Sequence, residues 1–256
     1  MVFNNNLLIG AASASAVTPG AGYTIDNSCM FDGSTGYQLF TISVWLKLSN
    51  VVAASKGIIG TGNGAVDEDA IVYANITNTM RALIDTGTNE GLQRTVALYR
   101  DPTAWYHFVF RFETTSAVAG NRIRMYKNGV LQDQTVTNQI SQSFTTAFNS
   151  TAIHGIGCRS PAGTPEQFFN GYMAEFIMID GQSLAPSSFG EFNSDGVWIP
   201  VDPSALTFGT NGFWLDFEDN SSAAALGNDV SGNDNDYSVS GLATSNQTTD
   251  TPTDSG

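Results

Sequence analysis

A short apolar run bounded by turn residues is the strongest structural signal in the chain. Residues 170–181 read Asn-Gly-Tyr-Met-Ala-Glu-Phe-Ile-Met-Ile-Asp-Gly, and Glu175 is the only charge between the Asn-Gly and Asp-Gly turns. A run this short between two glycines favours a strand buried on both faces over a helix. We therefore predict a central strand of a large antiparallel sheet, with further strands added on both of its sides.

Strict alternation of apolar and polar positions predicts two more strands. In residues 42–48 the aliphatic side chains fall on every second position, with Ser43, Trp45 and Lys47 between them. This pattern predicts a strand with one face in the core. In residues 105–112 the same spacing places an aromatic row on one face, made of Tyr106, Phe108, Phe110 and Phe112.

Turn signals divide the rest of the chain into short strands. Asn128-Gly129 lies between residues 122–126 and 130–136 and predicts a hairpin, because both turn residues accept positive φ. Residues 184–189 predict one helical turn near Pro186. Roughly a dozen short strands with almost no helical period predict an all-β fold, a two-sheet antiparallel β-sandwich. The other predicted strands are residues 29–33, 57–59, 70–73, 80–84, 95–99, 154–158, 197–202 and 212–218.

Composition changes at both ends of the chain. Residues 1–24 are rich in Ala, Ser, Gly and Asn, which predicts a flexible N-terminal arm. Residues 237–256 are rich in Ser, Thr, Asn and Asp, which predicts a C-terminal tail or linker. One sandwich domain, residues 25–236, is expected between them.

The charge of the chain excludes some partners. The net charge is −14 and only 13 % of residues are charged, about half the usual share of roughly 25 %. Such a chain repels phosphate backbones and anionic membrane surfaces, so we expect neither nucleic-acid binding nor membrane insertion. The N-terminus lacks the features of a secretory signal, which predicts folding in a reducing cytoplasm with Cys29 and Cys158 as free thiols.

Few residues suggest catalysis or phosphate binding. His107 and His154 are the only histidines, and we interpret both as structural. Glu175 has no acid at the neighbouring alternate positions of its strand, so we interpret it as a hydrogen-bonded carboxylate at a sheet edge. Residues 60–64 are glycine-rich but lack the Lys-Ser/Thr of a phosphate loop, so we interpret them as a loop tip.

Five motifs follow one another in a recognisable order. They are Cys-Met-Phe-Asp-Gly at 29–33, Thr-Ile-Ser-Val-Trp-Leu-Lys at 41–47, Trp-Tyr-His-Phe-Val at 105–109, Arg-Met-Tyr-Lys-Asn-Gly at 124–129 and Phe-Asn-Gly-Tyr-Met-Ala-Glu at 169–175. Their order resembles the laminin-G-like branch of the concanavalin A-like lectin/glucanase superfamily, over about residues 25–185. The resemblance implies a jelly-roll sandwich. Glucanases of this superfamily carry Glu-x-Asp-x-x-Glu on one strand, and this chain has no such triad.

The laminin-G-like resemblance also implies a permuted strand order. In that family an aromatic-rich strand followed by Asp-x-Ser-Gly-Asn-x-Asn-Asp usually opens the domain, whereas here residues 213–217 and 229–236 close it. We therefore expect the strand at 212–218 to fill the first strand's place and complete the sheet. The alternative is the start of a second, truncated domain.

A second resemblance concerns segments outside the five motifs. Residues 4–8, 189–198, 208–213, 229–236 and 250–253 are similar to tailed-phage virion proteins often described as tail-fibre-like. This resemblance implies a non-enzymatic virion protein, made in the host cytoplasm, that contacts other virion proteins and host-surface glycans. Virion symmetry suggests a homo-oligomer, most simply a trimer. The alternatives are a capsid decoration or cement protein and a glycan-degrading enzyme.

Calcium and glycans are the candidate ligands. Asp229, Ser231 and Asn233 have the alternating spacing of the first ligands of a calcium loop. The laminin-G-like resemblance implies calcium at the sandwich rim, held by Asp216, Asp219 or Asp229, with Asp67-Glu68-Asp69 as a second option. The alternative is a metal-free Asx-turn network. Glycan binding needs exposed aromatic rings, and the candidates by residue type, each of which could instead be core, are Trp198, Tyr99 and Trp105.

Overall fold

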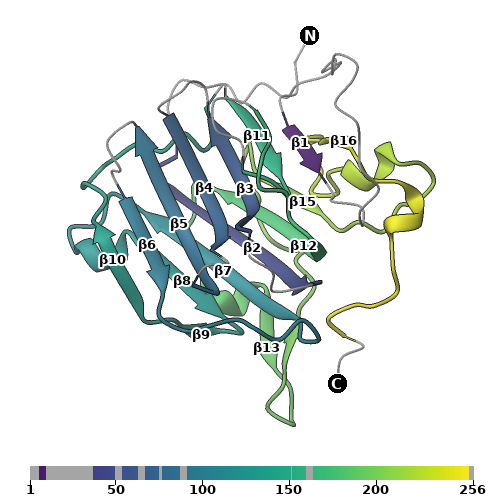
Figure 1. The fold of residues 1–256 in the computed structure, drawn as a ribbon, viewed down its shortest axis with the longest axis horizontal. Coiled ribbons are helices and arrows are strands. Elements are labelled where there is room, and N and C mark those ends of the chain that lie inside the picture. Colours follow the sequence, from purple (N-terminus) through teal and green to yellow (C-terminus); the bar gives the residue numbers. More distant parts are fainter. Residues whose placement is uncertain are drawn as a thin grey trace.

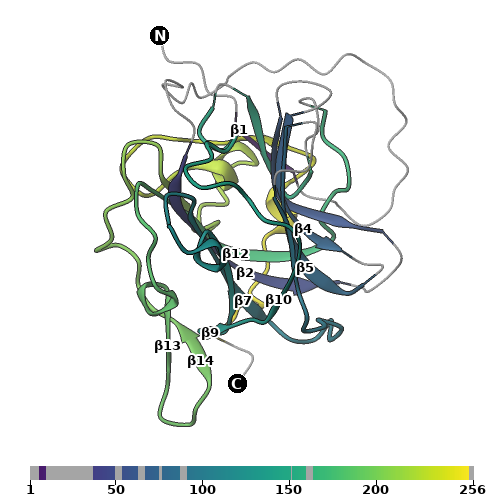
Figure 2. The same ribbon diagram turned by 90° about the vertical axis from the view of Figure 1, so that its left-hand side faces the viewer.

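The computed structural model describes residues 6–9, 37–49, 54–62, 67–74, 77–86, 91–150, 152–159 and 164–253. Within them the chain forms two large sheets that face each other, a small hairpin and short 3-10 turns, with no α-helix (Figures 1 and 2). The predicted all-β sandwich is therefore confirmed. No helix in this part of the chain is long and apolar enough to cross a membrane.

The eight-stranded sheet forms the front layer in Figure 1. It is antiparallel except around β1, which pairs parallel with strands on both of its sides. In spatial order its strands are β10 (Gln134–Asn138), β6 (Gly91–Thr95), β5 (Thr79–Thr86), β4 (Asp67–Ala74), β3 (Lys56–Gly62), β11 (Ile153–Ile156), β1 (Asn6–Ile9) and β16 (Ser238–Ser240).

The six-stranded sheet forms the second layer, and all of its pairs are antiparallel. Its strands in spatial order are β15 (Phe213–Leu215), β12 (Gly171–Asp180), β2 (Leu39–Leu48), β7 (Tyr106–Glu113), β8 (Ile123–Lys127) and β9 (Val130–Leu131). The small hairpin consists of β13 (Gly190–Phe192) and β14 (Trp198–Pro200). The 3-10 turns are η1 (Ala119–Asn121), η3 (Pro186–Ser188), η4 (Ala224–Gly227) and η5 (Thr244–Asn246).

The predicted aromatic row of β7 lies in the core. Phe108, Phe110 and Phe112 are almost fully buried and pack with aliphatic residues of both sheets. The Phe112 ring stacks on Phe40 with 4.3 Å between ring centroids. Interdigitating rings remove a large apolar area from water and hold the two sheets together.

The strand predicted at residues 170–181 is β12, and it has β2 on one side and β15 on the other, as expected. Burial on both faces holds only for residues 176–179, whereas Tyr172 is 40 % exposed. Glu175 has φ +50° at a bulge, where the register with β2 shifts. β15 pairs only with residues 176–178, so no described strand covers that side of the first half of β12.

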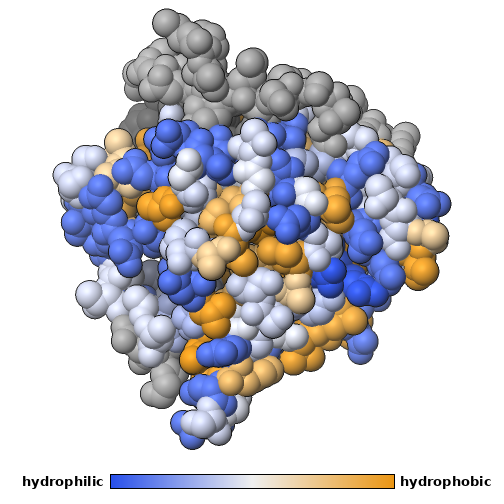
Figure 3. All heavy atoms as spheres, turned by 180° about the vertical axis from the view of Figure 1, so that it is seen from behind, coloured by the Kyte–Doolittle hydropathy of each residue, from blue (hydrophilic) through white to orange (hydrophobic). Residues whose placement is uncertain are grey.

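The face of β2 that was predicted to be polar and outward is also buried. Ser43 is 1 % exposed and Trp45 is 3 % exposed. The cause is a third layer, formed by the chain from about 184 to 208, which covers the outer face of the six-stranded sheet (Figure 2). Figure 3 views this side of the molecule, where hydrophobic side chains reach the surface between hydrophilic ones.

Several predicted boundaries were wrong for local reasons. The Asn128-Gly129 turn has positive φ at both residues and forms the predicted hairpin. However, residues 130–136 split into β9 and β10, which lie in different sheets because the chain crosses between the sheets near Gln132. The strand predicted at 95–99 is β6, a few residues earlier, and residues 60–62 belong to β3 instead of a loop tip. The strand predicted at 29–33 lies outside the described residues.

The two ends of the chain contribute to the fold more than their composition suggested. Residues 6–9 of the predicted N-terminal arm form β1, between β11 and β16; the rest of residues 1–24 lie outside the described part. In the predicted tail, Tyr237 is 2 % exposed and the segment 244–253, here called the C-terminal strap, is hydrogen-bonded to the sandwich. Its polar side chains supply hydrogen bonds, so low hydrophobicity did not mean the absence of structure.

Candidate functional site

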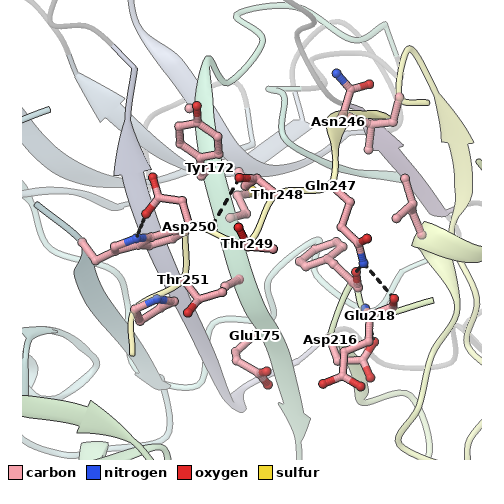
Figure 4. Close-up of a pocket in the computed structure, with 18 of the residues that line it drawn as sticks. Tyr172, Glu175, Asp216, Glu218, Asn246, Gln247, Thr248, Thr249, Asp250 and Thr251 are labelled. Carbon is pink, nitrogen blue, oxygen red and sulfur yellow. Dashed lines mark hydrogen bonds between the residues drawn. The ribbon is translucent and has the colours of Figure 1, made fainter. Parts of the chain in front are cut away.

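A cavity of about 1220 Å³ lies beside the uncovered first half of β12. Its walls come from three stretches that are far apart in sequence: β12, the chain that follows β15, and the C-terminal strap (Figure 4). The side chains of interest on these walls are Trp105, Tyr172, Glu175, Asp216, Glu218 and Gln247.

Strand pairing places two acids near Glu175. Antiparallel pairing of Phe176 with Leu215 continues toward Asp216, so the chain that leaves β15 carries its acids along the cavity wall. Asp216 and Glu218 were not predicted as neighbours of Glu175, because they lie on a different segment from its strand. The predicted pairing of 212–218 with the sheet contained this signal, but the register of that pair could not be read from the sequence.

Glu175 is a partly buried carboxylate with a perturbed pKa. Its Oε2 accepts a hydrogen bond from Trp214 Nε1 at 2.6 Å. The pKa of Glu175 is raised to about 7, mainly by burial; the hydrogen bond from Trp214 opposes this shift, and the negative charges of Asp216, Glu218 and Asp202 add to it. The side chain is hydrogen-bonded as expected, although β12 is not the edge strand.

The C-terminal strap is held by two polar anchors. Gln247 Nε2 donates to the carbonyl oxygens of Phe217 and Glu218, at 2.8 and 2.7 Å. Asp250 Oδ2 lies 2.6 Å from Lys47 Nζ, and its Oδ1 accepts a hydrogen bond from Trp105 Nε1 at 3.0 Å. Lys47 and Trp105 together lower the pKa of Asp250. The strap thereby closes one side of the cavity.

Tyr172 is the most exposed aromatic residue on the cavity wall. Its ring is 40 % exposed, with the Trp105 ring 6.4 Å away and Lys47 Nζ 6.0 Å from its centroid. Tyr172 was not predicted as a site residue, because an aromatic residue within an apolar run indicates a core position. Its position next to Asn170-Gly171, where the strand begins, was the available signal.

The three aromatic residues proposed as glycan platforms are buried, with exposed fractions of 3 % for Tyr99, 7 % for Trp105 and 8 % for Trp198. Tyr99 packs edge-on against Phe108, and Trp198 packs with Trp45 and Trp105. The expectation of exposed rings is thus corrected, because the core and the third layer cover them. Trp105 still borders the cavity and points its indole N–H at Asp250.

The proposed calcium ligands Asp216, Asp219 and Asp229 each accept hydrogen bonds from nearby groups of the chain. The Asp229 carboxylate accepts hydrogen bonds from the backbone N–H groups of Trp214, Ser231 and Asn235 and from Ser231 Oγ, at 2.8 to 3.0 Å. This is the Asx-turn network that was the alternative to calcium. Asp216 and Asp219 each accept a backbone N–H two residues ahead, and only Asp216 lines the cavity.

Calcium binding stays a prediction. In the described part of the chain, no group of three or more His, Cys, Asp or Glu side chains is arranged to hold a metal ion. In the second proposed set, Asp69 is buried and accepts a hydrogen bond from the Ala147 N–H, while the side chains at positions 67 and 68 lie outside the described residues.

Both histidines and Cys158 are buried structural residues. Burial lowers the pKa of His107 to about 3 and that of His154 to about 4, so both are neutral. Trp198 Nε1 donates to His107 Nδ1 at 2.9 Å, which leaves Nε2 to donate to Ser43 Oγ at 2.8 Å. Burial raises the pKa of the Cys158 thiol to about 12, so it stays protonated. Cys29 lies outside the described residues.

Replacement of Glu175 by glutamine is expected to stabilise the protein above pH 7 but not at pH 4.5. Between pH 4.5 and 7, Glu175 keeps its proton in the folded protein but loses it in the unfolded chain. The contribution of this group to the free energy of unfolding of the wild type therefore falls as the pH rises through about 7. We expect a gain of about 2 kcal/mol at pH 8, measured by urea unfolding at both pH values. An equal effect of Glu175→Gln at both pH values would contradict this, and Glu191→Gln, on the exposed hairpin, is the control.

Comparison with solved structures finds similar folds at low sequence identity. The CBM40 domain of the Ruminococcus gnavus IT-sialidase, bound to α2,3-sialyllactose, is 15 % identical, with a TM-score of 0.39 over 53 % of this chain and 72 % of that chain. NanB sialidase from Streptococcus pneumoniae is 13 % identical, with a TM-score of 0.46 over 64 % and 26 %. A heptameric pentraxin from Limulus polyphemus is 14 % identical, with a TM-score of 0.40 over 59 % and 67 %. Comparison with curated proteins finds no match.

Comparison with protein-family models gives a more specific result. Residues 20–184, well over half of the chain, match a laminin-G-like model described as concanavalin A-like lectin/glucanases superfamily. The match covers β2 to β12. These strands supply most of the core, and β12 forms one wall of the cavity. The chain therefore belongs to the concanavalin A-like lectin/glucanases superfamily.

Proposed function

We propose that this chain is a non-catalytic carbohydrate-binding module and that the cavity beside β12 is its glycan site. One observation carries the proposal: an accessible ring, Tyr172, lies in a large cavity together with carboxylate and amide groups on a lectin-superfamily sandwich. An aromatic ring can cover the apolar C–H face of a sugar, while Asp216, Glu218 and Gln247 offer hydrogen-bond partners for its hydroxyl groups. The buried rings of Tyr99 and Trp198 offer no such surface.

Replacement of Tyr172 by alanine is expected to reduce glycan affinity at least tenfold, because a buried aromatic contact contributes about 1.4 kcal/mol or more. A glycan array would select the ligand, and isothermal titration calorimetry would measure Kd. Phe192→Ala is the matched control, since its ring is 55 % exposed on the β13–β14 hairpin and does not line the cavity. If the glycan affinity of Tyr172→Ala were unchanged, the glycan would bind outside this cavity.

Glycan hydrolysis is the second candidate, and the raised pKa of Glu175 favours it. A general acid needs a pKa near the working pH, and glycosidases pair such an acid with a second carboxylate. Binding without cleavage is favoured because Glu175 is held by Trp214 and the superfamily's catalytic triad is missing. Release of reducing ends that Glu175→Gln abolishes would establish the hydrolase instead.

We also propose that the module belongs to a phage virion appendage, where it contacts other virion proteins and host-surface glycans as a homo-oligomer, most simply a trimer. The support is the resemblance of residues 189–198, 208–213 and 229–236 to tail-fibre-like proteins. The acidic net charge of −14 also disfavours binding to nucleic acid. Cryo-electron microscopy of particles with and without this chain tests the proposal. A few to tens of copies on a tail favours an appendage, hundreds on the capsid favours a decoration protein, and identical particles would contradict both.

A further inference from the structure

The wall of the proposed glycan site carries charges of one sign. Four of the described residues that line the cavity are acidic, namely Glu175, Asp216, Glu218 and Asp250, and none is Lys, Arg or His. The acids come from β12, from the chain after β15 and from the C-terminal strap, so they border the cavity on several sides (Figure 4).

Lys47, a cation close to the cavity, offsets the charge of only one of these acids. Lys47 Nζ lies 2.6 Å from Asp250 Oδ2, so its charge is already paired with one of the four acids. Beyond that pair, Glu175, Asp216 and Glu218 are left on the other side of the cavity. The cavity should therefore have a negative potential that a ligand experiences on entry.

The electrostatics of Glu175 agree with this arrangement of acids. Burial raises the pKa of Glu175 most, and the charges of Asp216 and Glu218, with Asp202 outside the cavity, also raise it. The negative charges that disfavour ionisation of Glu175 would also repel an anionic sugar in the cavity. The same charges would attract a cation. An ammonium group has three donors and can satisfy several carboxylate oxygens at once.

We infer that this cavity selects glycans with a free amino group over neutral glycans, and neutral glycans over glycans with a carboxylate. The inference rests on the proposed glycan-binding function and adds the charge class of the ligand. Tyr172 would cover the apolar face of the sugar ring, while Asp216 and Glu218 would receive the ammonium group. Neutral hydroxyl groups would use the amides of Asn246 and Gln247, which also line the cavity.

The experiment compares matched sugars that differ only at carbon 6. Oligosaccharides with glucose, galactose and mannose backbones are prepared in three forms, with a hydroxyl, an amine or a carboxylate at that carbon. Their Kd values for the full chain are measured at pH 7.5 and low salt, where the amine and the carboxylate are ionised. We expect the amine form to bind at least tenfold more tightly than the hydroxyl form, and the carboxylate form at least tenfold more weakly. Added salt should reduce both differences.

Two variants separate charge from shape. Asp216→Asn with Glu218→Gln should reduce the ratio of amine-form affinity to hydroxyl-form affinity to within about threefold, which is under 1 kcal/mol, because the neutral amides no longer attract an ammonium group. Glu191→Gln, an exposed acid outside the cavity, should preserve the preference. Equal binding of the three forms, tighter binding of the carboxylate form, or a preference that survives the double substitution would overturn the inference and leave glycan binding intact. Absence of binding to every backbone would overturn both proposals.

Discussion

Replacement of Trp198 by alanine is expected to lower the free energy of unfolding by about 4 kcal/mol. Trp198 is 8 % exposed and joins the third layer to the outer face of the six-stranded sheet, where it packs with Trp45 and Trp105. The substitution removes a large apolar contact and leaves His107 Nδ1 buried without its donor, and both effects destabilise the folded state.

The fit around Trp198 leaves no room for relaxation. A Cβ on Gly129 would lie 2.4 Å from the Trp198 ring, and one on Gly190 would lie 2.6 Å from it, so backbone contacts the ring from two sides. Alanine at position 198 would therefore leave a cavity that its neighbours cannot easily fill, which places the cost in the upper part of the known range.

Urea unfolding with a fixed m-value would measure the effect of Trp198→Ala. Phe192→Ala provides the control, because Phe192 touches the same tryptophan at a ring distance of 4.9 Å but is 55 % exposed. We expect it to cost no more than about 1 kcal/mol. If Trp198→Ala cost as little as Phe192→Ala, the third layer would not be the tightly packed element described above.

Replacement of Gly212 by alanine is expected to cost about 3 kcal/mol and to weaken glycan binding at the same time. A Cβ at this position would lie 1.9 Å from the Phe208 carbonyl oxygen and 2.6 Å from that of Met178. Because these contacts are with backbone, β15 must move away from β12. Asp216 and Glu218 follow directly after β15, so the cavity wall would move with it.

Thermal unfolding and glycan titration of the same sample would test this prediction. Gly120→Ala is the matched control, since nothing lies within 4 Å of a Cβ there and its φ is ordinary. We expect that variant to be unchanged or more stable by up to about 1 kcal/mol, through the lower entropy of its unfolded chain. Wild-type stability of Gly212→Ala would show that β15 is loosely attached to the sheet.

Local sequence patterns predicted the structure correctly where each pattern is compatible with a single local structure. The aromatic row of β7, the Asn128-Gly129 hairpin and the neighbours of β12 on both sides follow from period-two alternation and turn chemistry. The buried outer face of β2 could not be predicted in the same way. Ser43 and Lys47 are polar, and the chain that covers this face comes from distant residues whose docking position no local pattern encodes.

The candidate site was the part least accessible to sequence reasoning. Tyr172, Asp216 and Asp250 come together only through a bulge at Glu175, the short pairing of β15 and the docking of the strap. Each depends on a register or on a tertiary hydrogen bond, and a change of one residue in register would turn these side chains elsewhere. Trp198 and Tyr99 were glycan-site candidates by residue type alone, and their burial corresponds to the alternative, a core position.

The parallel pairing of β1 with β11 and β16 bears on how the protein is made. Residues 6–9 leave the ribosome long before their strand partners, residues 153–156 and 238–240. The nascent chain must therefore keep this segment unpaired until residues 153–156 emerge, and this edge of the sheet can close only after release of residues 238–240. Contacts so distant in sequence form slowly. A ribosome stalled before residue 153 should accordingly hold a chain that a protease cuts within residues 6–9.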